Sequence, residues 1–381
     1  MDTKSKSNST IYKSLTITVM LFVVLLVISI VLLFLVINRE DALKGADRAI
    51  RLSAQGGFDC EYAEAQKLFP FEEGVLKVLN DRVAYLTLSG NEVYSNTVNY
   101  QNPICSVNNE HAIVCDMDGY TFSMYTQDHQ VYEISTTEKI KAVSIASDGK
   151  CAIICDSEDA FGQVTIYDEN GVFIASWISY DSGYPLAAVF NSDSSKVMVS
   201  AVNTDGATYE SYIKVFSIVY EGSKYTASDY SMYIIPEDTI VSALCYCGEA
   251  MYAFSSSSIY TLSGESFAPL TLDIGSVNYE AVVGDNLFII YSDGVDQMNK
   301  LAILDSSNQI VYNSPVGSVV NAYCYNDSYF ALSIDRRIYV FDATGKVVAD
   351  ISVDEDVLRL GYIENDRLVV VSTGGVHSIT Y

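Results

Sequence analysis

One pattern constrains the fold of this chain more than any other: a strand, a tight turn and a second strand recur seven times between residues 83 and 351. From Val83 to Ile338 the copies are about 42 residues apart on average. Each copy is rich in Val, Ile, Tyr and Phe and carries Asp, Asn, Gly or Ser at its turn, as paired β-strands do. The copies read VAYLTLSGNEVYSN, FSMYTQDHQVYEIS, VTIYDENGVFIAS, IKVFSIVYEGSKYTAS, SIYTLSGESFAPLT, LAILDSSNQIVYNS and IYVFDATGKVVADI.

A second hairpin separates successive copies, as in VSIASDGKCAIICD and AVFNSDSSKVMVSA. Two hairpins in about 42 residues supply four antiparallel strands, which is the blade of a β-propeller. The sequence therefore predicts an all-β fold, a β-propeller of four-stranded blades, over residues 74–381. Its length at this spacing favours seven blades, with residues 75–96 helping to close the blade that begins near Leu358. Eight smaller blades are the alternative.

An apolar stretch near the beginning of the chain runs from Leu15 to Ile37 without a charged residue. At about 1.5 Å per residue, a helix of this length covers the ~30 Å hydrocarbon core of a bilayer. The stretch is longer than the core of a signal peptide and no small-residue cleavage site follows it. We therefore expect a tail at 1–14, an uncleaved single-pass transmembrane helix (a signal-anchor) at 15–37 and a stalk and connector at 38–73. Helical spacing over residues 39–53 predicts that the anchor helix continues as the stalk.

Charge is distributed unevenly along the chain. Residues 1–51 hold 7 Lys and Arg and 4 Asp and Glu, which leaves 15 basic and 44 acidic residues in the rest. Such an acidic domain repels nucleic acid and anionic lipid head groups, so nucleic-acid binding is excluded. Basic residues flank both ends of the apolar stretch, and counting them does not decide its orientation. Because large domains after a signal-anchor commonly translocate, we expect a cell-membrane protein with a cytoplasmic N-terminus and an extracytoplasmic propeller.

Motifs for chemistry are absent from the sequence. It contains no H-x-x-x-H, C-x-x-C, G-x-S-x-G, P-loop or G-x-G-x-x-G pattern, and we expect no cofactor, no metal site and no catalytic residue. The cysteines align with small residues of other repeats, where buried Cys acts as a small hydrophobe. The best candidate for a disulfide is the pair Cys105 and Cys115, which the sequence places across one hairpin from each other.

Loop length points to a binding face. In a four-stranded blade, the connections that follow the second and fourth strands emerge on one face, and here these connections are the longer ones. Loops on a rigid scaffold favour binding, and Tyr and Trp supply contact area at low entropic cost. The residues predicted to form this binding face are Glu158, Asp159, Phe161, Trp177, Tyr180, Asp181, Tyr184, Asp205, Tyr209, Tyr230, Tyr233, Asp293 and Asp296.

Short motifs carry a resemblance to known repeats. SDGK and NSDSSKVMVS resemble the turn of WD40-like and TolB-like propellers, and YDENGVFIASW resembles quinoprotein-type repeats. The whole layout, including the NPICSV step after the first hairpin, is similar to an uncharacterised family of single-pass, membrane-anchored extracytoplasmic propellers of Gram-positive anaerobes. That resemblance implies the fold and unpaired cysteines, and it supplies no catalytic residues.

Three functions remain open at this point. The first is a membrane-tethered, non-enzymatic propeller that binds an envelope protein or a wall polymer through its long loops. The second is a scaffold or assembly subunit of a membrane complex that acts through the anchor and stalk, residues 12–53. The third is a glycan-active enzyme that uses loop carboxylates, for which Glu158, Asp159, Asp181 and Asp205 are the candidates.

Overall fold

The computed structural model describes residues 49–51, 56–108, 110–222, 224–235, 239–272, 276–292, 298–317, 319–364 and 366–381, together with Leu26, Val27 and Ser29, which are helical. Residues Ala46–Tyr381 form one compact unit and Met1–Gly45 another. Apart from these three helical residues, the transmembrane helix predicted at 15–37 lies outside the described residues. None of the helical stretches that the structure describes has the length and apolar content that a membrane crossing requires.

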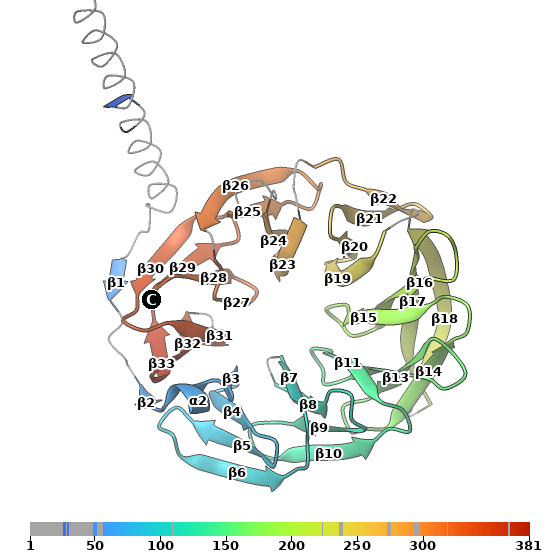
Figure 1. The fold of residues 1–381 in the computed structure, drawn as a ribbon, viewed down its shortest axis with the longest axis horizontal. Coiled ribbons are helices and arrows are strands. Elements are labelled where there is room, and N and C mark those ends of the chain that lie inside the picture. Colours follow the sequence, from blue (N-terminus) through green and yellow to red (C-terminus); the bar gives the residue numbers. More distant parts are fainter. Residues whose placement is uncertain are drawn as a thin grey trace, which may run out of the picture. The chain divides into compact units, whose positions relative to one another are not determined.

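The compact unit is a β-propeller of eight blades arranged as a ring around a central axis (Figure 1). In each blade the first strand lies at the axis and the fourth at the rim. Blade 1 contains β3 (Leu68–Phe71), β4 (Gly74–Val78), β5 (Arg82–Thr87) and β6 (Glu92–Thr97), and blade 2 contains β7 (Pro103–Val107), β8 (Ala112–Asp116), β9 (Thr121–Tyr125) and β10 (Gln130–Ser135). Blade 3 contains β11 (Ile140–Ile145), β12 (Cys151–Cys155), β13 (Gly162–Tyr167) and β14 (Phe173–Ser179), and blade 4 contains β15 (Tyr184–Phe190), β16 (Lys196–Asn203), β17 (Glu210–Glu221) and β18 (Lys224–Ile235).

The second half of the ring repeats this arrangement. Blade 5 contains β19 (Val241–Cys247), β20 (Ala250–Ser255), β21 (Ile259–Ser263) and β22 (Ser266–Pro269), and blade 6 contains β23 (Ser276–Val283), β24 (Asn286–Ser292), β25 (Asn299–Leu304) and β26 (Ile310–Gly317). Blade 7 contains β27 (Ala322–Tyr325), β28 (Tyr329–Ile334), β29 (Arg337–Asp342) and β30 (Val347–Ser352). Blade 8 contains β31 (Val357–Glu364), β32 (Arg367–Ser372), β33 (Gly375–Thr380) and, from the other end of the chain, β2 (Gly57–Asp59).

The preference for seven blades is therefore wrong, and the alternative of eight is confirmed. Residues 75–96 do not close the last blade, because together with β3 they form blade 1. Strand β2 closes the ring instead, pairing antiparallel with β33 so that Phe58 lies opposite Val376. Strands from the beginning and the end of the propeller thus pair in one sheet, which closes the ring.

The segment predicted as stalk and connector contributes to the propeller. Strand β1 (Ala49–Arg51) pairs parallel with the rim strand β30 of blade 7, so these residues are extended and not part of a helical stalk. A short helix, α2 (Tyr62–Ala65), and β3 follow β2. The propeller thus begins before residue 74, at which the sequence placed its start.

Apolar side chains fill the spaces between neighbouring blades. Between blades 7 and 8, for example, Val340, Leu368 and Val370 are fully buried. Residues that alternate along one strand face the two neighbouring blades in turn, so each blade is apolar on both sides. This explains why the repeats are so rich in Val, Ile and aromatic residues.

All eight cysteines are free thiols. Cys105 pairs with Val114 across the β7–β8 hairpin, whereas Cys115 pairs with Ile104, so the two thiols point to opposite sides of the blade. The predicted Cys105–Cys115 disulfide is therefore excluded by register. Burial raises the pKa of both thiols to about 12.

Candidate functional site

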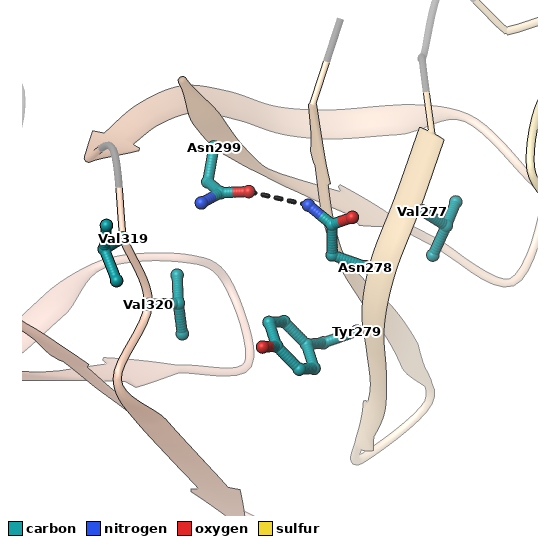
Figure 2. Close-up of a pocket in the computed structure, with 6 residues that line it drawn as sticks. All are labelled: Val277, Asn278, Tyr279, Asn299, Val319 and Val320. Atoms are coloured by element: carbon teal, nitrogen blue, oxygen red, sulfur yellow. Dashed lines mark hydrogen bonds between the residues drawn. The ribbon is translucent and has the colours of Figure 1, made fainter. Parts of the chain in front are cut away.

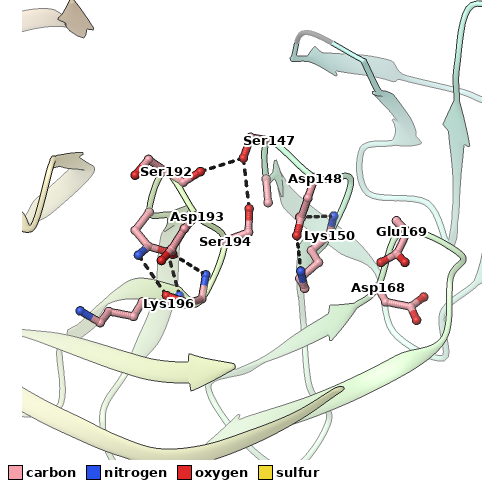
Figure 3. A network of polar contacts seen from close by, with 12 residues as sticks. Ser147, Asp148, Lys150, Asp168, Glu169, Ser192, Asp193, Ser194 and Lys196 are labelled. Carbon is pink, nitrogen blue, oxygen red and sulfur yellow. Dashed lines mark hydrogen bonds and ion pairs between the residues drawn. The ribbon is translucent and has the colours of Figure 1, made fainter. Parts of the chain in front are cut away.

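The connections that follow the second and fourth strands of each blade lie on one face of the ring, which we call the long-loop face. They include residues 156–161 and 180–183 around blade 3, and 204–209 in blade 4. The connections on the opposite, short-hairpin face are tight turns, and some of them hydrogen-bond to a turn of the next blade. Figure 3 shows two of them, in which the Ser147 hydroxyl donates to the carbonyl oxygen of Ser192 at 3.0 Å and contacts the Ser194 hydroxyl at 3.2 Å. The two faces therefore differ in how much loop surface remains available to a partner.

Four of the predicted binding residues come together at the corner of blades 3 and 4. The Phe161 and Tyr184 rings pack edge to face with centroids 5.0 Å apart. Tyr180 is 64% exposed, and Asp181 beside it is exposed as well. The amide of Asn203 donates to the Asp181 carbonyl oxygen at 3.0 Å, which connects the loop of blade 3 to blade 4.

Two other predicted residues are structural. Trp177 belongs to β14 and packs against Phe216, and the Lys214 ammonium lies 4.5 Å from its ring centroid. Burial lowers the pKa of Lys214, although the nearby Asp181 opposes this shift. Tyr233, in β18, packs edge to face on Phe267 with centroids 5.5 Å apart. Both aromatic rings therefore hold adjacent blades together.

The remaining predicted residues are either exposed singly or not described. Glu158, Asp159, Asp205 and Tyr209 are exposed on the loops of blades 3 and 4. The Tyr230 side chain, Asp293 and Asp296 lie outside the described part of the structure. Sequence reasoning missed two exposed apolar residues at the same corner, Met232 and Ile234 in β18.

The inner strand β23 is flanked by two cavities near the long-loop face. Its register against β24 shifts between Val277 and Tyr279, so Asn278 is the extra residue of a β-bulge. One cavity, of about 410 Å³, lies on the side of blade 7 and is lined by Tyr279, Asn299 and Val320 (Figure 2). Asn278 borders both cavities, and its amide donates to the Asn299 side-chain oxygen at 2.7 Å. Bulges often re-aim side chains next to functional sites.

The second cavity, of about 380 Å³, lies between blades 5 and 6, and we call it the Glu280 pocket. Its lining includes Ser242, Phe254, Asn278 and Glu280. Burial raises the pKa of the Glu280 carboxyl, and no basic side chain contributes to that shift. Nothing in the sequence distinguishes Glu280 from the other acidic residues, because its position depends on the register of β23.

A serine, a histidine and a glutamate meet on the long-loop face of blade 8, but they are not arranged as a catalytic triad. The Ser372 hydroxyl lies 3.2 Å from His377 Nε2, and the Glu355 carboxylate lies 3.8 Å from the same nitrogen. A triad requires the acid at Nδ1, so that Nε2 remains available to the serine. Ser372 is only 2% exposed and donates to Glu355, which also accepts the Gly374 amide at 3.0 Å. This cluster stabilises a turn.

Across the described ranges, no three His, Cys, Asp or Glu side chains gather in a way that would hold a metal ion. The four carboxylates considered for glycan chemistry, Glu158, Asp159, Asp181 and Asp205, are all exposed to solvent. The geometry on the long-loop face is that of a surface with pockets, formed by aromatic, acidic and hydroxyl side chains.

Comparison with protein families gives a match over residues 51–380, to a family of unknown function designated DUF5711. The chain belongs to the DUF5711 family. A comparison with curated proteins finds no match for this DUF5711 protein.

Among solved structures, BamB from Moraxella catarrhalis is similar, with a TM-score of 0.53 and 11% identity over 86% of this chain and 100% of BamB. The β-propeller domain of Cps50 (Swd1) from Myceliophteria thermophila has a TM-score of 0.47 and 10% identity over 74% of this chain and 98% of that chain. At this identity, the likeness to BamB shows the propeller fold alone.

Proposed function

We propose that this DUF5711 protein is a membrane-tethered, non-enzymatic propeller that binds an envelope protein through its long-loop face. The observation that carries the proposal is the corner of blades 3 and 4, where exposed Tyr180 and Asp181 lie on the loop before β15 and exposed Tyr184 begins that strand. Exposed aromatic side chains next to well-ordered structure are typical of residues that dominate protein interfaces.

The charge of the domain favours a protein over an anionic wall polymer as the partner. Residues 52–381 hold 44 acidic and 15 basic residues. An anionic polymer would be repelled, whereas a basic protein surface would be attracted and its association accelerated. The uncharged stretch that begins at Leu15 and ends at Ile37 supports tethering to the cell membrane. The proposal takes the propeller to be extracytoplasmic because large domains after a signal-anchor commonly translocate. Tethering also raises the local concentration of the propeller near other membrane proteins.

The test is affinity capture from solubilised envelope with the full-length chain, compared with two single variants of the same blade. Tyr180 and Phe173 lie at opposite ends of β14 and are 64% and 58% exposed, so they form a matched pair. Tyr180→Ala should reduce capture of a stoichiometric protein at least about tenfold, as expected for an interface residue worth more than about 1.4 kcal/mol. Phe173→Ala, on the short-hairpin face, should leave capture unchanged. Equal capture by both variants would contradict the proposal.

Replacing residues 12–48 with an unrelated span, which keeps strand β1 of the propeller, tests the scaffold alternative in the same assay. Capture that survives the replacement supports the propeller as the binding part. Capture that is lost, although the propeller still folds, would move the function to the anchor and stalk.

A further inference from the structure

The Glu280 pocket contains a carboxylate that the protein itself leaves without a counter-charge. Within the described residues, the Glu280 side chain has no hydrogen bond to another side chain and no salt bridge, and its own backbone amide is the one donor that lowers its pKa. Buried carboxylates that serve only structure are normally paired or hydrogen-bonded, because removing a charge from water is costly. A partly buried, unpaired carboxylate in a cavity is instead typical of a functional site.

Two other oxygen atoms in the pocket are available to accept hydrogen bonds. The Ser242 hydroxyl has no hydrogen-bond partner among the described residues. The Asn278 amide group donates to Asn299, which leaves the Asn278 side-chain oxygen as an acceptor. The hydroxyls of Ser255 and Ser276, by contrast, donate to the carbonyl oxygens of Ser258 and Ser256. Three separate acceptors, one of them charged, therefore line one cavity.

We propose that the Glu280 pocket binds a primary ammonium group on an aliphatic stem, as presented by a lysine side chain of the partner protein. An ammonium group has three hydrogen-bond donors in a tetrahedral arrangement, which Glu280, Ser242 and Asn278 can accept. A guanidinium favours a planar, bidentate arrangement on one carboxylate, and the separated acceptors match it less well. Ile240, Ala243 and Val277 supply apolar walls for the methylene groups of the stem.

This inference rests on the proposed function, because it assigns one contact of the same long-loop face. It also extends the face from the corner of blades 3 and 4 to the interface of blades 5 and 6. A lysine bound there would place a cation beside the Glu280 carboxyl, which would lower the pKa that burial raises.

The test uses the full-length chain and two small probes, Nα-acetyl-lysine amide and its uncharged counterpart Nα-acetyl-norleucine amide, titrated by NMR or calorimetry. The lysine probe should bind at least about tenfold more tightly than the norleucine probe, since a hydrogen-bonded charge pair is lost in the second. Glu280→Gln keeps the shape of the side chain and should reduce lysine-probe binding by about the same factor. Glu265→Gln, an exposed acid in the β21–β22 turn of the same domain, is the matched control and should bind as the wild type does.

Thermal unfolding of Glu280→Gln shows whether lost binding results from misfolding. Because the substitution removes a partly buried charge, the variant should be at least as stable as the wild type. Equal affinity of the wild type for the two probes, or unchanged lysine binding by Glu280→Gln, would overturn the inference. Tighter binding of glucosamine than of the lysine probe would overturn it too, since an amino sugar lacks the aliphatic stem. If Glu280→Gln captures the envelope partner as well as the wild type while Tyr180→Ala does not, the proposed function stands and this inference fails.

Discussion

Replacing Gly57 by alanine tests whether β2 closes the ring by pairing with β33. Gly57 has a φ of 142°, a conformation that L-residues rarely adopt. A Cβ added there would stand 2.0 Å from the carbonyl oxygen of Val376. Because that oxygen belongs to the backbone of β33, it cannot rotate away, and β2 would have to separate from β33.

The magnitude follows from the contacts that separation would break. Two backbone hydrogen bonds flank the paired residues, from Ser378 N to Gly56 O and from Cys60 N to Gly374 O, each 2.9 Å long. Two such bonds contribute about 1–3 kcal/mol net, and re-exposing the half-buried Phe58 ring adds about 1 kcal/mol. The free energy of unfolding should therefore fall by about 2–4 kcal/mol. An unfolding entropy of about 2.1 cal/mol/K per residue converts this to a loss of roughly 3–6 °C in Tm.

Thermal unfolding followed by far-UV circular dichroism measures this loss. Gly56→Ala is the matched control, because a Cβ at Gly56 meets no atom within 4 Å. Hydrogen–deuterium exchange should also show faster exchange at residues 57–60 and 375–378 in Gly57→Ala. Closure by β2 would be refuted if Gly57→Ala had the Tm of the wild type. It would also be refuted if Gly56→Ala lowered Tm by as much as Gly57→Ala does.

Side chains within the blades give three further predictions. Trp177→Phe should lower the free energy of unfolding by about 1–2 kcal/mol, because packing and the contact with Lys214 become weaker. Urea unfolding measures this loss. Affinity capture should show that partner binding is unchanged. Burial raises the folded-state pKa of Glu280, so the unfavourable effect of its charge on stability is absent below the unfolded-state pKa and is complete above the folded-state pKa. Glu280→Gln should therefore raise Tm at pH 7 and leave it unchanged at pH 4, and equal effects at both pH values in thermal unfolding would disprove the assignment. Cys105 and Cys115 should react slowly with a thiol reagent at pH 8 in the native protein, and non-reducing peptide mapping that joins them would contradict the register.

The repeat of about 42 residues was enough to predict the blade and the fold, because each blade is local in sequence. The number of blades was not predictable in the same way. Blade 8 takes β2 from the far end of the chain, and β3, which contains Pro70 between two Phe residues, has no counterpart in the repeat pattern. Counting repeats therefore assigned the strands of blades 1 and 8 to a single blade, whereas the long-range pairing of β2 with β33 makes them two.

Register explains most of the other differences. A shift of one residue moves a side chain to the other side of a blade, so Cys105 and Cys115 could not be paired from spacing alone. Trp177 and Tyr233 lie at strand ends that the sequence assigned to loops, and their rings pack between blades. Residues 49–51 have helical spacing, but the exposed edge of β30 provides backbone partners that favour an extended strand. The Glu280 pocket depends on the bulge at Asn278, for which the sequence has no signal.

The most direct test of partner binding through the long-loop face is a hydrogen–deuterium exchange footprint of the captured complex against the free full-length chain. We expect protection at residues 156–161 and 180–184 on the long-loop face, with the turn at residues 168–172 on the short-hairpin face unchanged. Protection confined to the short-hairpin turns, with the loops of blades 3 and 4 exchanging as in the free chain, would contradict binding through the long-loop face.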